Sequence, residues 1–136
     1  MVLPMAVTLA MTDFDKRAKD WRNGAIVYQI FVDRFVAPSD RKAKAKFFKA
    51  PKTYKEWSET PKGGHFSPEL GVWTHELDFW GGDLKGVTSK LDYIKGLGAE
   101  IVYLNPIHEA FTNHKYDATD YLKVDPAFGT QADLKN

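Results

Sequence analysis

Two short apolar runs flank one amphipathic segment in the 136-residue chain. Residues 25–32 (AIVYQIFV) are almost continuously apolar, rich in β-branched and aromatic side chains, and bounded by Gly24 and Asp33. A second run, EIVYLNP, occupies residues 100–106. Runs of this length without alternation predict strands that are buried on both faces, as in a parallel sheet.

Residues 81–98, between these runs, show helical periodicity. Apolar residues recur at steps of three and four, at Leu84, Val87, Leu91, Ile94 and Leu97. Asp83 is expected to cap the start of the helix, and Gly98 is expected to follow its end. The pattern therefore predicts one helix over 83–97. A strand, a helix and a strand make a βαβ unit, in which the two strands run parallel.

Residues 36–80 follow neither period and are predicted to form a long loop insertion. A short helix is expected in its sequence SDRKAKAKFF, with Ser39 as the N-cap. The insertion also holds a group of basic residues: Arg41, Lys42, Lys44, Lys46, Lys49, Lys52 and Lys55. They alternate with Ala, Phe and Pro and match no nucleic-acid-binding module, so a solvated surface is predicted. The final stretch, GTQADLKN, predicts the start of another helix.

Composition narrows the class of protein. The chain is 43% hydrophobic and 14% aromatic, which suits a folded core. Its net charge of +1 provides no overall field that favours nucleic acid or an anionic membrane. The absence of Cys excludes disulfides and thiolate metal sites. No apolar run approaches the ~18 residues of a membrane span.

Residues 1–20 are expected to be a disordered leader. Their apolar start, MVLPMAVTLAM, lacks the preceding basic residues and the cleavage site of a signal peptide. The sequence therefore leaves localisation open between the cytoplasm and secretion.

The segment after the second strand concentrates polar and aromatic side chains. Asn113, His114, Tyr116 and Asp117 lie within five residues. In parallel α/β folds, ligands bind beyond the carboxyl ends of the strands. An aromatic ring suits the apolar face of a sugar, and neighbouring polar groups suit its hydroxyls. The same residues also suit turn capping and packing, so both interpretations stand at this point.

Three stretches together resemble the α-amylase family, glycoside hydrolase family 13. They are VYQIFVDRF (27–35), FWGGDLKGVTSKLDYIKGLGAEIVYLNPI (79–107) and NHKYDATDYLKVDPAFGT (113–130). The stretches occur in the family's order. The resemblance covers roughly residues 21 to 136.

The resemblance implies an α/β fold, part of a (β/α)8 TIM barrel. Residues 25–32 would be its first strand, 83–97 its first helix and 101–105 its second strand, followed by the start of the second helix. Residues 21–136 would thus form the N-terminal fragment of a catalytic domain. The family cleaves or transfers α-glucosidic bonds with retention, using two carboxyl groups about 5 Å apart. Those groups, and a third carboxylate, follow the fourth, fifth and seventh strands, so no residue of this chain is expected to be catalytic.

Binding residues carry over from the resemblance. Tyr116 matches a tyrosine that stacks on the sugar beside the scissile bond. Asn113 occupies a position that is acidic in some exo-acting members, and an amide there favours an open cleft acting on α-1,4-glucan. His114 and Asp117 complete the motif, with Asp117 expected to order the loop.

Some relatives bind calcium through acidic residues after DRF and through the GGD turn. Here Gly81 and Asp83 remain as candidate metal ligands. The first loop, however, holds only Asp40, and calcium prefers six to eight oxygens. Calcium is therefore a doubtful cofactor.

Three functions remain open from the sequence. The chain is expected to be an inert piece of an α-glucan hydrolase that needs the rest of the barrel and binds starch or maltooligosaccharide, without a nucleic-acid or membrane partner. A non-catalytic carbohydrate-binding module would use the aromatic residues Trp57, Trp73, Trp80 and Tyr116. An interaction fragment would bind an acidic partner through the basic insertion.

Overall fold

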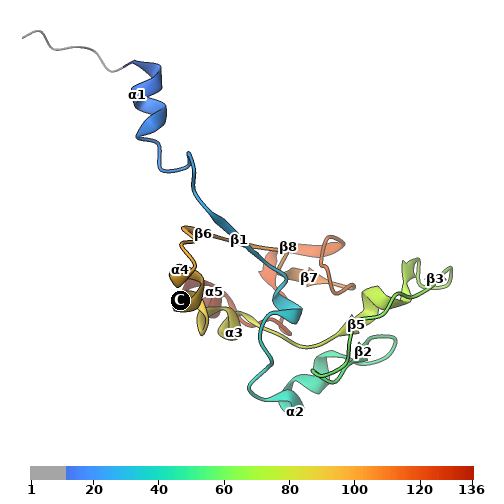
Figure 1. Ribbon diagram of the computed structural model, residues 1–136. Coiled ribbons are helices and arrows are strands. Elements are labelled where there is room, and N and C mark those ends of the chain that lie inside the picture. The colour runs from blue at the N-terminus through green and yellow to red at the C-terminus, as the bar shows by residue number, and fades with distance from the viewer. Residues whose placement is uncertain (1–11) are drawn as a thin grey trace, which may run out of the picture.

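The computed structural model describes residues 12–136. Its α-helices and 3₁₀ turns (η) are α1 (Asp13–Ala18), η1 (Val32–Arg34), α2 (Arg41–Lys44), η2 (Ala45–Phe47), η3 (Thr74–Leu77), α3 (Leu84–Thr88), α4 (Leu91–Gly96) and α5 (Gln131–Lys135). Its strands are β1 (Val27–Ile30), β2 (Thr53–Tyr54), β3 (Phe66–Ser67), β4 (Val72–Trp73), β5 (Asp78–Phe79), β6 (Ile101–Leu104), β7 (His108–Ala110) and β8 (Ala118–Val124). Figure 1 shows α1 standing away from the other elements.

Strands β1 and β6 pair in parallel, with Val27 opposite Ile101 and Ile30 opposite Leu104. This pairing confirms the predicted βαβ unit. The expectation of burial on both faces was wrong, because Val27 is 53% exposed and Tyr103 is 50% exposed. Every sheet in residues 12–136 has two strands, so the outer edges of β1 and β6 have no neighbour there and no barrel closes.

The helix predicted over 83–97 is divided into α3 and α4. The break falls at Lys90, whose φ of −115° and ψ of 7° are not helical. Just before it, the hydroxyl of Thr88 donates to the Leu84 carbonyl and that of Ser89 donates to the Gly86 carbonyl. Such side-chain bonds compete with the backbone ladder of a helix and favour its interruption.

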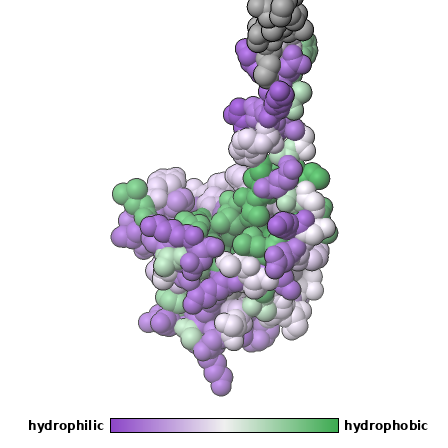
Figure 2. Space-filling view, turned by 90° about the vertical axis from the view of Figure 1, so that its left-hand side faces the viewer, coloured by the Kyte–Doolittle hydropathy of each residue, from purple (hydrophilic) through white to green (hydrophobic). Residues whose placement is uncertain are grey.

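The two ends of this segment behave as predicted. The carboxylate of Asp83 accepts from the Gly86 amide at 2.8 Å and caps α3. Gly98 follows α4 with a φ of +82°, a left-handed conformation that glycine adopts without strain. Only part of the apolar stripe is buried, since Leu91 and Leu97 are 40% and 52% exposed. Hydrophobic side chains accordingly gather on the face that includes α4 (Figure 2).

The insertion contains more structure than a loop. Strand β2 pairs in parallel with β5, and β3 and β4 form a small hairpin. The N-cap of α2 is Asp40 rather than Ser39, because the Asp40 carboxylate accepts from the Ala43 amide at 2.9 Å. At the other end of the chain, Thr130 caps α5 as the predicted helix start requires.

The core joins β1, the insertion and the turn after β8. Its most buried large residues are Ile30, Val32, Phe79, Ile94 and Phe128, each at most 1% exposed. Phe79 of β5, the last strand of the insertion, and Phe128 of the turn after β8 thus belong to one hydrophobic cluster.

Of the expected leader, residues 1–11 lie outside the described residues. Residues 13–18 form α1, where Thr12 and Asp15 cap each other reciprocally. No helix among the described residues is long and apolar enough to cross a membrane.

Candidate functional site

Residues 111–117, here called the polar loop, connect the antiparallel strands β7 and β8. Asp117 orders it from within: its carboxylate accepts from the amides of Phe111 and Thr112 at 3.1 and 3.0 Å and from the Thr112 hydroxyl at 2.5 Å. Partial burial acts to raise the pKa of Asp117, but these hydrogen bonds outweigh it and hold that pKa below its ordinary value. The loop is thus closed around an ionised carboxylate.

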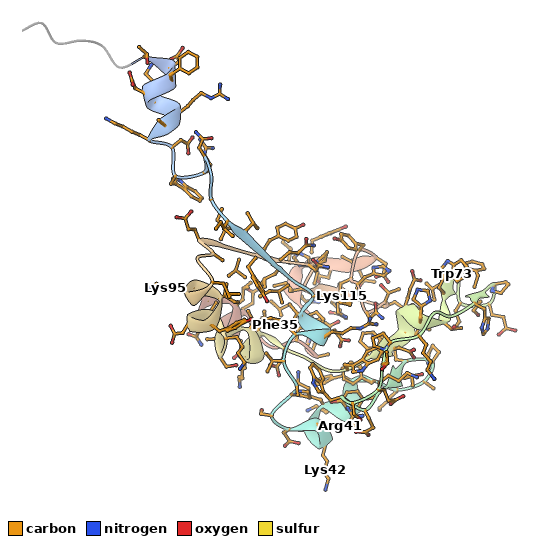
Figure 3. The ribbon with its side chains drawn as sticks, viewed as in Figure 1. Phe35, Arg41, Lys42, Trp73, Lys95 and Lys115 are labelled. Carbon is orange, nitrogen blue, oxygen red and sulfur yellow. The ribbon has the colours of Figure 1, made fainter. Side chains whose placement is uncertain are left out.

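Lys115 and Tyr116 point in opposite directions. Lys115 has a φ of 62°, in the left-handed region, and its side chain is 1% exposed. Its ammonium lies 2.5 Å from the Asp125 carboxylate and 4.9 Å from the centre of the Phe128 ring. Figure 3 shows Lys115 among the side chains at the centre of the molecule. The buried lysine anchors the loop, whereas the ring of Tyr116 is 61% exposed.

The imidazole ring of His114 contacts Tyr116 and helps to fix its position. The Tyr116 amide donates to His114 Nδ1 at 3.1 Å, and the Thr112 hydroxyl oxygen lies 3.1 Å from the same nitrogen. Nε2 lies 3.5 Å from a carboxylate oxygen of Glu76 in η3. The rings of His114 and Tyr116 are 5.7 Å apart between centroids. Glu76, which sequence reasoning did not single out, therefore helps to orient the candidate ring.

Asn113 faces inward, with 4% of its surface exposed. Its side-chain nitrogen donates to the carbonyls of His75 and Asp78 at 2.9 and 3.0 Å. Its backbone amide donates to the Glu76 carbonyl at 2.7 Å. The four predicted residues thus lie on one loop, but Tyr116 presents a large exposed ring and Asn113 ties the loop to η3 and β5.

A second turn, at residues 80–82, is built around Asp33. The Asp33 carboxylate is fully buried and accepts from the amides of Trp80 and Gly81, both at 2.9 Å. Burial raises the pKa of Asp33 above its ordinary value, although these amides and the cations Arg34 and Lys115 act in the opposite direction. Trp80 itself is 4% exposed and is therefore not available as a sugar platform.

The candidate metal ligands Gly81 and Asp83 contact a lysine. The ammonium of Lys44 lies 2.7 Å from Asp83 Oδ2, 3.0 Å from the Gly81 carbonyl oxygen and 2.7 Å from the Ala127 carbonyl oxygen. Within residues 12–136, no group of three or more His, Asp or Glu side chains is arranged to hold a metal ion. The residues around this turn therefore do not fit the six to eight oxygens that calcium prefers.

Sequence reasoning missed two partly buried lysines, Lys44 and Lys52. The basic residues of the insertion were expected to face solvent, and Lys42 does so (Figure 3). Lys44 instead binds backbone oxygens, and Lys52 approaches the Ala110 carbonyl at 3.4 Å. Burial lowers the pKa of Lys52, with Lys115 adding to the effect. No local pattern distinguishes these lysines from Lys42, so the sequence held no signal for them.

Known proteins are similar to this chain in sequence and in fold. The family model of the alpha-amylase catalytic domain matches residues 29–136. Amylopullulanase of Thermoanaerobacterium saccharolyticum is 40% identical over an alignment that covers 92% of this chain and 10% of that protein. Intracellular maltogenic amylase of Bacillus subtilis (strain 168) is 38% identical, with 83% of this chain and 16% of that protein covered.

A solved structure agrees. The cyclic alpha-maltosyl-(1→6)-maltose hydrolase of Arthrobacter globiformis superposes with a TM-score of 0.62 at 37% identity, covering 85% of this chain and 22% of that chain. The present chain thus spans only a small part of the length of the relatives it matches. It belongs to the alpha-amylase family, glycoside hydrolase family 13.

Proposed function

We propose that the chain forms the first part of a (β/α)8 catalytic domain that acts on α-1,4-glucan by a retaining mechanism. In this proposal β1 and β6 are neighbouring barrel strands, α3 and α4 form the first crossover, and α5 begins the second. The parallel pairing of β1 with β6 and the exposed residues along their edges support it. Further strands would cover those edges.

The exposed ring of Tyr116 is the observation that carries the proposed substrate contact. A phenol ring held at the rim of the fold offers an apolar face on which a glucose unit stacks. Lys115 fixes the backbone beneath it, and His114 and Asp117 limit its movement. In this proposal Asn113 acts by positioning the loop, and the sugar contacts Tyr116.

No residue of this chain is proposed as the catalytic nucleophile or acid/base. A retaining glycosidase needs two carboxyl groups about 5 Å apart across the scissile bond. The buried carboxylate of Asp33 accepts from the amides of Trp80 and Gly81, and that of Asp125 accepts from the amide of Ala127. The 136-residue chain alone is therefore expected to release no reducing sugar from starch.

Substitution of Tyr116 tests the substrate contact. The test uses the full-length protein, which in this proposal carries the complete barrel. Tyr116→Ala is expected to lower kcat/KM for maltooligosaccharides about tenfold or more, because the stacking surface is lost. Tyr116→Phe keeps the ring and should stay within about twofold of wild type. Tyr93→Ala is the matched control, since Tyr93 on α4 is also exposed, at 57%, but lies outside the loop. Unchanged kinetics in Tyr116→Ala would refute the proposed role.

A second candidate function is carbohydrate binding without catalysis. Trp73 and Phe66 on the β3–β4 hairpin are both 48% exposed, and their ring centroids lie 6.1 Å apart. Trp73 lies far from Lys115 in Figure 3, at the outer end of the insertion. If this hairpin is the glucan site, Trp73→Ala should abolish retardation of the protein in starch-containing native gels, and Tyr116→Ala should not.

A further inference from the structure

The ammonium group of Lys44, on α2, contacts two other segments of the chain, the turn at 81–83 and the turn after β8. Its oxygen partners belong to the turn before α3, to the N-cap of α3 and to the turn after β8. Two of these hydrogen bonds span 37 and 83 positions in the sequence. The side chains of Lys44 and Asp83 are only 14% and 13% exposed. An ordinary surface ion pair joins two flexible side chains, whereas here two partners are backbone carbonyls.

The number of oxygens around Lys44 Nζ and their distances suit an ammonium ion rather than a calcium ion. A lysine ammonium has three N–H donors, and three oxygens surround Lys44 at 2.7–3.0 Å. These are hydrogen-bond lengths, with the charge-assisted bond among the shorter ones. Calcium–oxygen distances lie at about 2.3–2.6 Å in a shell of six to eight ligands. The second oxygen of Asp83 caps α3 by accepting from the Gly86 amide.

The neighbours of Lys44 hold it in place. Asp40 caps α2 at its start, and the guanidinium of Arg41 lies 3.8 Å from the centre of the Tyr54 ring. Arg41 also pairs with Glu56 at 3.1 Å. Tyr54 lies so close to Gly81 that a Cβ there would come within 2.7 Å of its hydroxyl oxygen and 2.8 Å of a ring carbon. The helix that carries the lysine and the turn that receives it are thus fixed to the same aromatic ring.

We propose that Lys44 is a built-in cationic tether. Its ammonium occupies the point where oxygens of the 81–83 turn and of Ala127 converge, and it holds the insertion, the start of α3 and the turn after β8 together. This junction then needs no calcium ion. The proposal does not depend on the sugar-binding role of Tyr116.

Local hydrogen–deuterium exchange in the full-length protein tests the tether. The peptides to follow cover 79–86 and 125–130, where the Leu84 amide donates to the Phe128 carbonyl across the junction. Lys44→Met is expected to speed their exchange about tenfold or more, since it leaves a carboxylate without its cation. Lys42→Met, on the same helix but facing solvent, is the matched control and should leave the exchange unchanged. Equal exchange in the two variants would overturn the proposal.

Calcium is tested on the unaltered protein. Exchange of the same two peptides is expected to be identical in EDTA and in calcium chloride, because the ammonium is covalently part of the chain. Slower exchange in calcium that is confined to these two peptides would show that a metal ion binds at this junction and would overturn the proposal. Peptides elsewhere in the protein are followed in the same experiment, because a calcium ion bound at a distant site would slow exchange there as well.

Amine labelling provides an independent measurement if Lys44→Met does not fold. Reductive methylation of the unaltered protein, read by peptide mass spectrometry, compares Lys44 with Lys42. Lys44 must leave its three oxygens before it reacts, so its modification is expected to be about tenfold slower or more. Equal rates for the two lysines would contradict the tether.

Discussion

The buried ion pair between Lys115 and Asp125, beneath the Tyr116 loop, is expected to stabilise the domain far more than the exposed ion pair between Lys123 and Asp120. Lys115→Met keeps most of the aliphatic length of the side chain and removes only its charge. The Asp125 carboxylate then stays buried without its cation, although its other oxygen still accepts from the Ala127 amide at 2.8 Å. The side chains of this pair are 1% and 9% exposed, so water cannot replace the ammonium.

Removing one partner of a buried ion pair costs about 3–5 kcal/mol of unfolding free energy. The remaining amide contact of Asp125 favours the lower part of this range. Lys123→Met is the matched control, because Lys123 pairs with Asp120 at 2.9 Å on the same hairpin but is 66% exposed. Exposed pairs contribute about 0–1 kcal/mol, so this variant should be close to wild type. The two substitutions are chemically identical and differ in burial.

Urea unfolding of the full-length protein, followed by tryptophan fluorescence, measures the difference. The product of the fitted urea slope and the shift in midpoint should show a loss of about 3–5 kcal/mol for Lys115→Met. The double variant Lys115→Met/Asp125→Asn should recover part of the loss, since it no longer buries an unpaired charge. Equal midpoints for Lys115→Met and Lys123→Met would refute the inference that the buried pair anchors the loop.

Three further outcomes are expected. Gly82→Ala should destabilise by about 1–3 kcal/mol in thermal melts, because its Cβ would lie 2.2 Å from the Val32 carbonyl oxygen, whereas Gly96→Ala meets no atom within 4 Å and should not destabilise. A folded pKa below the unfolded value means that ionised Asp117 stabilises the loop above pH ~3.9 and that this contribution is lost as the pH falls through the folded pKa. The NMR shift of the Thr112 amide should therefore titrate with a midpoint below 3.9, and Asp117→Asn should abolish the step. The isolated 136-residue chain should aggregate or melt without a sharp transition, because the edges of β1 and β6 are open; a sharp melt of a monomer would contradict the barrel proposal.

Elements that depend on local chemistry followed from the sequence. The parallel pair β1–β6, the cap at Asp83 and the start of a helix near residue 131 were predicted from apolar runs, a capping residue and the final stretch of the sequence. The break at Lys90 was not predicted, because the apolar stripe continues across it without interruption. The periodicity does not show that a side-chain hydroxyl competes with the backbone for hydrogen bonds there. Periodicity reports which face is apolar and says little about whether a helix is continuous.

The sequence predicted which loop forms the candidate site, but not which of its side chains point inward and which point outward. Asn113 and Tyr116 were grouped together, yet one is 4% and the other 61% exposed. The difference depends on the left-handed φ of Lys115 and on its distant partner Asp125, and neither can be read from five adjacent letters. Lysine is rarely buried unless it is paired, so any expectation from residue type alone places Lys115 at the surface.

The insertion is better understood as the support of the site than as an addition to it. Asn113 donates to carbonyls of η3 and β5, Lys52 approaches the Ala110 carbonyl, and Lys44 reaches the Ala127 carbonyl. Each contact joins residues 36–80 to the segment 110–127. Because Tyr116 belongs to that segment, a change in the length or charge of the insertion moves the ring through rigid, buried contacts. If Tyr116 binds the sugar as proposed, substrate specificity is therefore expected to respond to substitutions in the insertion that do not contact the sugar.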